Sequence, residues 1–537
     1  MLGGHGLFTW GETQRASYLN TITIIDHLGQ FVQAHEESRR GPAFGGALLQ
    51  PRSDRGELAL QVMPHLRGLV SEKKRLMGSF TDLPEVQEFI NSKDAKALSH
   101  LGTSCPDHFI RTKIRPLFVE LKSDADLAAV KAALSQAMQH YRREYAEYYQ
   151  RHALPDSPAM RDPNPTVVLL PGVGMFSFGK NKTEARITGE FYRNAIQVMK
   201  GATALAAEGS QANSNLPQAG AAAPSVEFPV YANYVALPAA EAFRIEYWAL
   251  EEAKIRRQPP EKELSRQIAL IVGGASGIGR AAALLAAERG AHVAVADRDL
   301  AGAEAAAREA QAITGREAAI AVAVDIRSRE SIRSAIRETI AAFGGLDILV
   351  NTAAIFPAPP DGVVSDAMWG TTLELNVTAN FLLAEEAAKI FAEQNLEASV
   401  VLTSSANAVV PKRGSEAYDV SKAALSHLVR ELAVALSPKV RVNGIHPATV
   451  VKGSTMFPRD RVMASLTKYK LEFKRESTDE ELRTQLAEFY ARRTLTHQPI
   501  EPEDCAQAIL FLAGPKARCT SGHLIPVDGG LPEAFLR

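Results

Sequence analysis

The sequence predicts an α/β protein whose C-terminal part, residues 266–537, folds as a doubly wound parallel sheet. Three observations support this prediction: short β-branched runs recur, alanine-rich stretches of helical length separate them, and the runs are apolar almost throughout. Strands that are covered on both faces show this pattern. The expected strands are residues 268–272, 292–297, 318–326, 346–351, 398–405 and 440–447. Such an alternation is typical of one parallel-sheet domain.

The pattern of residues 1–254 predicts a separate α/β region. A long charged amphipathic helix is expected over 126–150, and a strand with a Gly-rich turn over 167–179, followed by another helix. Residues 202–227 are mostly Ala, Gly, Ser, Asn and Pro, so they bury too little apolar surface to offset their ordering entropy and are expected to be a flexible insertion. The Pro pair and mixed charge of residues 255–265 indicate a linker.

Composition excludes several classes of function. The 537 residues contain 60 basic and 61 acidic side chains, so no net charge favours nucleic acid or an anionic membrane as a partner. Three scattered cysteines (Cys105, Cys505 and Cys519) provide neither a disulfide framework nor a metal knuckle. No apolar run reaches the roughly 18 residues that cross a bilayer, and the first residues lack a signal-peptide pattern. We therefore expect a soluble cytoplasmic protein.

A nucleotide site is predicted where the first expected strand, 268–272, runs into the glycine-rich turn 273–279, GGASGIG. The turn opens a helix, whose free N–H groups and positive dipole end suit a pyrophosphate. Asp297 ends the next strand, where a carboxylate accepts hydrogen bonds from ribose hydroxyls and repels a 2′-phosphate. This favours NAD, although the guanidinium of the neighbouring Arg298 would offset part of that repulsion and leaves NADP as the weaker alternative.

The chemistry is predicted around Tyr418 and Lys422, which lie four residues apart and therefore share one helix face. A lysine ammonium beside the phenol is expected to lower its pKa from about 10 toward neutrality, making it an acid and base. Ser405 ends the expected strand 398–405, and its hydroxyl is placed to bind the substrate oxygen. The adjacent Ser404 is an alternative for that role.

Across roughly residues 265–534 these motifs resemble the short-chain dehydrogenase/reductase family. The family's glycine, NNAG and PG motifs are imperfect here, with Val272, Ala354 and Ala448 at changed positions, while VDGG (527–530) matches its C-terminal signature. The resemblance adds Asn376 to a catalytic tetrad with Ser405, Tyr418 and Lys422, and it implies hydride transfer to or from a nicotinamide in a homo-oligomer. It places the cofactor on Gly273, Ser276, Gly277, Ile278, Gly279, Asp297, Asp325, Ile326, Asn351, Ala353, Tyr418, Lys422, Pro447 and Val450.

Residues 452–497 occupy the place of that family's substrate loop and are long and charged. Two interpretations remain open: a solvated helix pair, or contacts between its cations and a phosphate or carboxylate of the substrate. The cations concerned are Lys452, Arg459, Arg461 and Lys468.

The first half resembles class II aldolases, and the whole order resembles fusions of rhamnulose-1-phosphate aldolase with a short-chain dehydrogenase. The segments that carry this are residues 3–13, 100–116, 169–186 and 241–254. The resemblance makes His5 a candidate zinc ligand and implies that the dehydrogenase half processes lactaldehyde. The HxH pair of class II aldolases is absent from the sequence, so we expect an N-terminally truncated, incomplete aldolase site. The alternative is a site rebuilt with His5 from His27, His35, His65, His100 or His108.

Three functions follow as hypotheses. The first is an NAD-dependent dehydrogenase of a small aldehyde, alcohol or polyol from deoxysugar breakdown. The second is a bifunctional zinc-dependent lyase and dehydrogenase, and the third is a dehydrogenase-like fold with a binding role. The four matching tetrad positions argue against the third.

Overall fold

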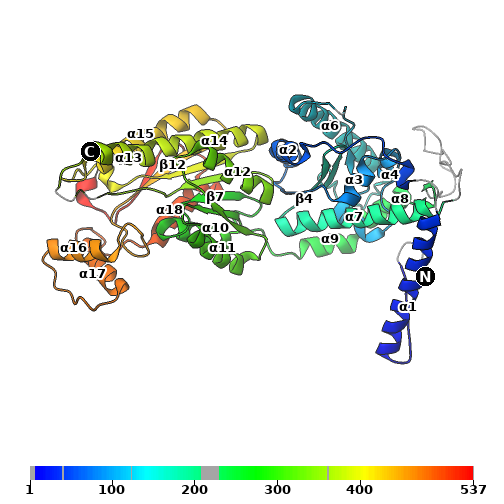
Figure 1. Ribbon diagram of the computed structural model, residues 1–537, viewed down its shortest axis with the longest axis horizontal. Coiled ribbons are helices and arrows are strands. Elements are labelled where there is room, and N and C mark those ends of the chain that lie inside the picture. Colours follow the sequence, from blue (N-terminus) through cyan, green and yellow to red (C-terminus); the bar gives the residue numbers. More distant parts are fainter. Residues whose placement is uncertain are drawn as a thin grey trace. The chain divides into compact units, whose positions relative to one another are not determined.

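The computed structural model describes residues 6–38, 42–122, 124–206, 229–357, 359 and 362–535 (Figure 1). The chain divides into two compact units, Met1–Pro260 and Glu261–Arg537, which are described separately below. In the described part of the chain, no helix is both long and apolar enough to cross a membrane.

The C-terminal unit is built on a seven-stranded sheet in which every neighbouring pair is parallel, in the order β13-β12-β11-β10-β7-β8-β9. The prediction of a doubly wound parallel sheet is thus confirmed. The strand order reverses between β7 and β10, and a crevice opens at the carboxyl ends of the strands at such a point. The strands are β7 (Ile268–Val272), β8 (His292–Asp297), β9 (Ala319–Ala323), β10 (Ile348–Asn351), β11 (Ala398–Thr403), β12 (Val440–Pro447) and β13 (Leu524–Val527).

Helices cover both faces of this sheet, as Figure 1 shows. One face carries α10 (Gly277–Glu288), α11 (Leu300–Thr314) and α18 (Pro502–Ala513). Alanines line the packed side of α10 and α11, and these small side chains let the helices approach the sheet closely. The other face carries α12 (Arg329–Phe343), α13 (Asp366–Leu373), α14 (Ala379–Gln394) and α15 (Glu416–Leu436).

Strand ends differ from the sequence prediction in a way that matters for function. The expected strand 318–326 stops at Ala323, and 398–405 stops at Thr403. The residues that follow, 324–326 and 404–405, leave the ladder and line the crevice. The short edge strand β13, with four residues, was not predicted.

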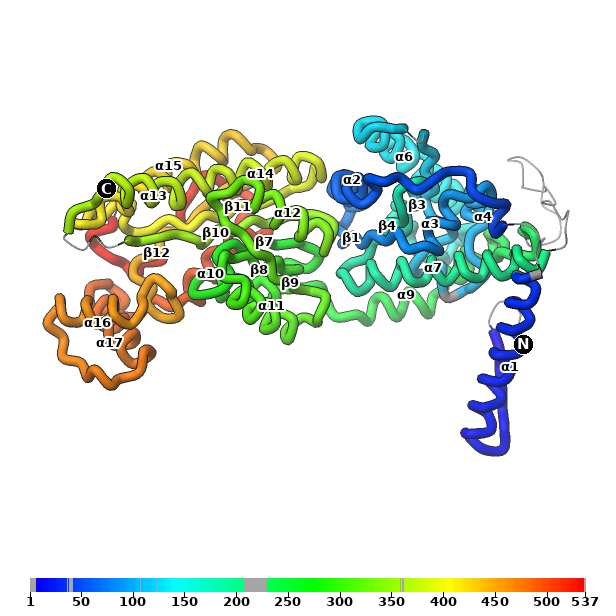
Figure 2. Tube along the Cα trace, viewed as in Figure 1, coloured from blue at the N-terminus to red at the C-terminus, as the bar shows by residue number. Residues whose placement is uncertain are grey.

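Residues after β12 form two helices, α16 (Arg459–Lys468) and α17 (Asp479–Ala491). Figure 2 shows this pair in orange, extending beyond the sheet of the unit. The pair has a small core of its own, so it is a built element and not an irregular loop. That core contains Val451, Val462, Leu466, Leu482, Leu486 and Ala487.

The N-terminal unit holds a mixed four-stranded sheet in the order β1-β4-β3-β2. Antiparallel pairs join β4 (Gly174–Gly179) to β1 (Met77–Thr81) and to β3 (Val167–Leu170), and β2 (Leu117–Phe118) is parallel to β3. A hairpin joins β5 and β6. The remaining elements are α1 (Gln14–Ser38), α2 (Arg55–Val70), α3 (Pro84–Ile90), α4 (Ala95–Leu101), α5 (Phe109–Thr112), α6 (Leu127–His152), α7 (Lys182–Ala204), β5 (Val230–Tyr231), β6 (Tyr234–Val235), α8 (Ala239–Glu246) and α9 (Ala249–Arg256).

Two predicted boundaries in this unit shift. Because α7 continues to Ala204, the start of the expected insertion at residue 202 is wrong, since those residues still bury apolar surface within a helix. Residues 207–227 of that insertion lie outside the described residues. Likewise α9 extends into the expected linker 255–265, and the division between the units falls within that range.

Candidate active site

A cleft of about 2330 Å³, including its open mouth, lies in the C-terminal unit at the carboxyl ends of the strands. It is lined by the glycine turn, by the ends of several strands, by α15 and by the segment that leads into α16. Clefts at this position of a doubly wound sheet bind the ligand. Of the cofactor-binding residues predicted above, all but Asn351 line it.

The glycine turn has a conformation that other residues would not tolerate. Gly273 has φ +78°, and a Cβ there would lie 2.6 Å from Thr352 Oγ1. A Cβ on Gly279 would lie 2.0 Å from the carbonyl oxygen of Gly273. The turn therefore folds over the start of α10 at a separation that only glycine permits, which leaves backbone N–H groups open to a pyrophosphate.

Asp297 holds the turn as well as facing the cleft. Its carboxylate accepts hydrogen bonds from the backbone N–H of Ala275 at 3.1 Å and of Asp299 at 3.0 Å. Arg298 lines the cleft beside it. The acid therefore stands at the end of β8, next to the glycine turn, where the sequence placed it.

Asp325 lines the cleft but its carboxylate is engaged by Arg327, whose Nη2 donates at 2.7 Å. The hydrogen bond from Arg327 holds the pKa of Asp325 below its usual value. Ile326 lines the cleft next to it.

Asn351 is 1% exposed and does not reach the cleft. Its Nδ2 donates to Asn380 Oδ1 at 2.8 Å, and Asn380 Nδ2 donates to the carbonyl oxygen of Asn376 at 2.9 Å. Its Oδ1 accepts from the N–H of Ala353 at 3.0 Å. Asn351 therefore positions the strand end and the Asn376 helix, and Asn380 is a linking residue that the sequence analysis missed.

The four residues of the predicted tetrad come from three neighbouring elements. Asn376 is fully buried in a single π-helical turn, Glu374–Thr378, between α13 and α14. Such turns are frequent at functional sites. Its side-chain amide exchanges two hydrogen bonds with the backbone of Ile355, both 2.9 Å, and also donates to Ser421 Oγ at 3.0 Å. Asn376 thus joins the cleft wall to α15.

Tyr418 and Lys422 lie on one face of α15, with Lys422 Nζ 5.6 Å from the centre of the Tyr418 ring. Lys422 Nζ donates to the carbonyl oxygen of Thr403 at 2.8 Å. Burial lowers the pKa of Lys422 to about 7. Burial also raises the pKa of Tyr418 to about 12, and a hydrogen bond with Ser405 only partly opposes this.

The expectation that Lys422 alone brings the Tyr418 pKa toward neutrality is therefore wrong for the chain by itself. Lys422 is buried and Tyr418 is half-buried, and loss of water weakens the charged form of each.

The two candidate serines have different partners. Ser404 Oγ donates to the carbonyl oxygen of Lys422 at 2.9 Å and lies 2.8 Å from Ser426 Oγ, which in turn lies 2.8 Å from His446 Nε2. Ser405 Oγ accepts from the N–H of Asn407 at 3.1 Å and bonds Tyr418. Ser404 thus ties β11 to α15, while Ser405 lies beside the Tyr418 hydroxyl in the cleft.

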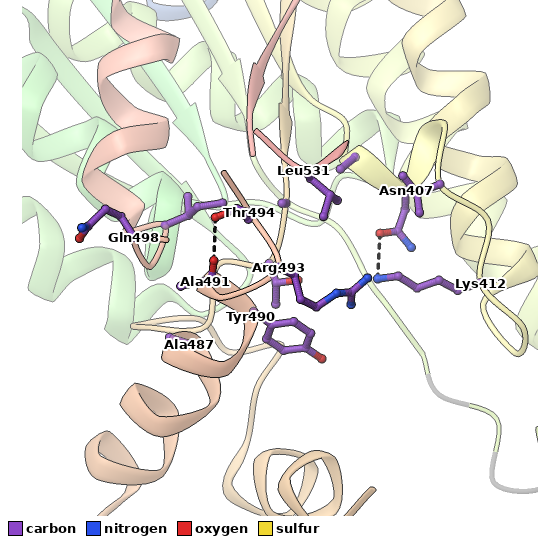
Figure 3. Close-up of a pocket in the computed structure, with 14 residues that line it drawn as sticks. Asn407, Lys412, Ala487, Tyr490, Ala491, Arg493, Thr494, Gln498 and Leu531 are labelled. Carbon is purple, nitrogen blue, oxygen red and sulfur yellow. Dashed lines mark hydrogen bonds between the residues drawn. The ribbon is translucent and has the colours of Figure 1, made fainter. Parts of the chain in front are cut away.

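The far end of the cleft adjoins a small side pocket, about 530 Å³ when its open mouth is included (Figure 3). The sequence did not predict Phe356, which lines the cleft. It also did not predict three residues that line the side pocket, Lys412, Tyr490 and Arg493. These residues lie far apart along the chain, and no motif marks them.

No metal centre is found within the ranges that the structure describes, where no three His, Cys, Asp or Glu side chains gather closely enough to hold an ion. The candidate ligand His5 lies outside the described residues. Of the alternative ligands, His35, His65, His100 and His108 each contact a group of their own unit: Phe31 O, Ser135 Oγ, Lys96 O and Thr103 Oγ1.

Comparisons with known proteins agree with these two folds. The family "Aldolase class II, second domain" matches residues 57–255, and the family "Enoyl-(Acyl carrier protein) reductase" matches residues 273–532. An uncharacterized oxidoreductase of Bacillus subtilis, YuxG, is 36% identical over 99% of this chain and 72% of its own length.

Other relatives match the second half. The human dehydrogenase/reductase SDR family member 4 is 33% identical over 52% of this chain and 90% of its own length. An L-rhamnose 1-dehydrogenase (NAD(P)(+)) of Azotobacter vinelandii is 30% identical over 49% of this chain and 95% of its own. The chain is an oxidoreductase with a short-chain dehydrogenase/reductase domain. It belongs to the family in which that domain follows a class II aldolase domain.

Proposed function

We propose that the chain is an NAD-dependent dehydrogenase that transfers hydride between the nicotinamide and a small aldehyde, alcohol or polyol of deoxysugar catabolism. The observation that supports it most is the convergence of Ser405, Tyr418 and Lys422 on one cleft behind a glycine turn. The relative named as an L-rhamnose 1-dehydrogenase and the aldolase-type first half support the carbohydrate assignment.

The residues present fit a nicotinamide dinucleotide. Gly273 and Gly279 have no room for a Cβ against Thr352 and the Gly273 carbonyl, so the turn packs closely and the start of α10 faces the cleft, where a pyrophosphate would bind. Asp297 and the backbone at Asp325 and Ile326 would hold the ribose and adenine. When bound, the oxidised cofactor supplies the hydride acceptor and a positive charge.

The chain's own residues would move the proton. In alcohol oxidation Tyr418 Oη accepts the substrate hydroxyl proton, and Ser405 Oγ, whose acceptor side is used by Asn407 N–H, donates to the reacting oxygen. Lys422 stabilises the phenolate, while its carbonyl is fixed by Ser404. Asn376 positions α15 through Ser421.

The test is NAD reduction by the purified chain across lactaldehyde, rhamnose, fucose and common polyols, each also supplied as a phosphate ester or carboxylate derivative, followed by titration with NADH and NADPH. We expect turnover with at least one compound of this group and tighter binding of NADH, because Asp297 repels a 2′-phosphate. Equal or tighter binding of NADPH would reject the NAD assignment, and inactivity across the panel would reject the substrate class.

A second candidate is a bifunctional lyase and dehydrogenase, which the aldolase family match over residues 57–255 favours. It would need a zinc site, for which His5 is the candidate from the sequence. We further infer a cytoplasmic location and a homo-oligomer, the first supported by three cysteines that are all free.

A further inference from the structure

The substrate end of the cleft and its side pocket is strongly cationic. Among the described lining residues, the acids are Asp297 and Asp325, and both belong to the nucleotide end. The substrate end presents no acid but carries basic side chains from three elements. Four of them, which we call the cation cluster, are Lys412, Arg461, Lys468 and Arg493.

Most of these charges have no carboxylate partner among the described residues. Within the described ranges, no salt bridge involves Lys412, Arg461 or Lys468, and Arg493 has only an exposed contact of 3.4 Å with Glu533. Asp419, the acid near Lys412, already accepts three hydrogen bonds, from Asn407 Nδ2, the Lys412 N–H and Ser415 Oγ.

Other cations of the same segment behave differently. Arg459 pairs with Asp479 at 2.6 Å, and Lys452 lies 3.4 Å from Glu501; neither lines the cleft. The four cations that the sequence singled out in residues 452–497 thus divide into two that are paired and two, Arg461 and Lys468, that face the cleft without such a partner.

Arg461 is held in place beside the chemistry. Its Nη1 donates to the carbonyl oxygens of Phe356 and Met456, at 2.8 and 3.1 Å. Its Cζ lies 4.6 Å from the centre of the Phe356 ring, and that ring lies 4.2 Å from the ring of Tyr418. The guanidinium is therefore one aromatic ring away from the proposed acid and base, with donors still unused.

Lys412 and Arg493 approach each other despite their like charge. Figure 3 shows their side chains extending toward one another near the Tyr490 ring. Burial is the main cause that lowers the pKa of Lys412, and Arg493 and Lys468 lower it further, while Tyr469 and Asp419 oppose this. Like charges gathered in a recess are unfavourable unless an anion lies between them.

Resting on the proposed dehydrogenase function, we propose that the substrate carries an anionic group, a phosphate monoester or a carboxylate, which the cation cluster binds while Tyr418 acts on the carbon at the other end. The reacting group would lie at Ser405 and Tyr418 and the anion beyond Phe356. This narrows the substrate to a charged hydroxy or carbonyl compound.

Equilibrium binding tests this independently of turnover. Methyl phosphate and acetate are titrated calorimetrically into the NADH-saturated chain, into Lys412→Met/Lys468→Met and into Lys452→Met, the control that alters a paired lysine outside the cleft. We expect one anion to bind the double variant at least about tenfold more weakly, with the control equal to the parent. Unchanged NADH affinity shows that the variants are folded. The proposal would be overturned if, for methyl phosphate and also for acetate, the double variant bound the anion as tightly as the parent does.

Turnover then separates the two anion chemistries. NADH oxidation is compared for glyceraldehyde 3-phosphate against glyceraldehyde, and for succinic semialdehyde against butanal. We expect the charged member of one pair to have at least about tenfold greater kcat/KM, and the double variant to lose this advantage through KM. If glyceraldehyde and butanal each have a kcat/KM equal to or greater than that of the charged compound paired with it, the anionic-substrate proposal is refuted. If no compound turns over, the binding result alone decides, and only the proposed dehydrogenase function is contradicted.

Discussion

Lys422 is a charged group kept in an unfavourable place. It is 2% exposed, and burial lowers its pKa from 10.5 to about 7. Between those values the unfolded chain binds more protons than the folded chain, so the lysine reduces stability at neutral pH, and this loss is recovered as pH rises. Burying Lys422 therefore destabilises the folded protein at neutral pH, and it leaves in the active site a lysine that can lose its charge.

This predicts a pH-dependent difference between the parent and Lys422→Met. From pH 7 to pH 9 the free energy of unfolding of the parent should rise relative to that of the variant, by up to about 1.4 kcal/mol per pH unit. Denaturant unfolding of both proteins at pH 7, 8 and 9 measures it. A constant difference would mean that the folded pKa is not lowered.

Ser405 and Ser404 should respond oppositely to alanine. Ser405→Ala removes a donor to the reacting oxygen, so kcat should fall by about 100-fold or more with stability nearly unchanged. Ser404→Ala leaves the Lys422 carbonyl and Ser426 with one partner fewer, so stability should fall by about 1–3 kcal/mol while kcat changes less. Steady-state kinetics and denaturant unfolding of both variants measure this. The reverse pattern would assign the catalytic role to Ser404 and the structural role to Ser405.

At the scale of elements, local motifs were the most predictable part. The glycine turn, Tyr418 and Lys422 depend on neighbours within a few residues, so spacing alone predicted them. Asn351 and Ser404 form hydrogen bonds with Asn380 and Ser426, which lie more than 20 residues away in the sequence. Motif spacing cannot predict such distant partners. The ends of β9 and β11 were overextended because the chain continues past each strand into residues that line the cleft, and spacing alone does not mark where the ladder stops.

The turn between β7 and α10 gives the element-scale prediction. In Gly279→Ala the new methyl would meet the Gly273 carbonyl oxygen, so the turn must open. We expect NADH affinity to fall at least about tenfold and stability by about 1–3 kcal/mol. Gly370→Ala, in α13 with nothing within 4 Å of its Cβ position, is the matched control and should be neutral or slightly stabilising. Equal NADH binding by both variants would contradict the account of the turn.

At the scale of the whole molecule, the two units differ in how much chemistry their described residues assemble. The C-terminal unit gathers an acid/base, a lysine and a nucleotide turn in one cleft, whereas the described part of the N-terminal unit brings no potential metal ligands together in threes.

Metal analysis of the purified chain tests whether the N-terminal unit holds a zinc ion. We expect less than stoichiometric zinc and no cleavage of a ketose 1-phosphate, because a catalytic zinc needs at least three protein ligands. Tightly bound stoichiometric zinc that is lost in His5→Ala would show that a site is completed around His5, and would favour the bifunctional enzyme.

The central claim is that Tyr418 transfers the proton in a nicotinamide-dependent reaction, and the most direct measurement compares the parent with Tyr418→Phe. NADH affinity and turnover are measured on both proteins, with the best substrate from the panel. Because the substitution removes only the hydroxyl, NADH should bind nearly as tightly while kcat falls by about 1000-fold or more. Turnover by Tyr418→Phe within about tenfold of the parent would contradict the assignment.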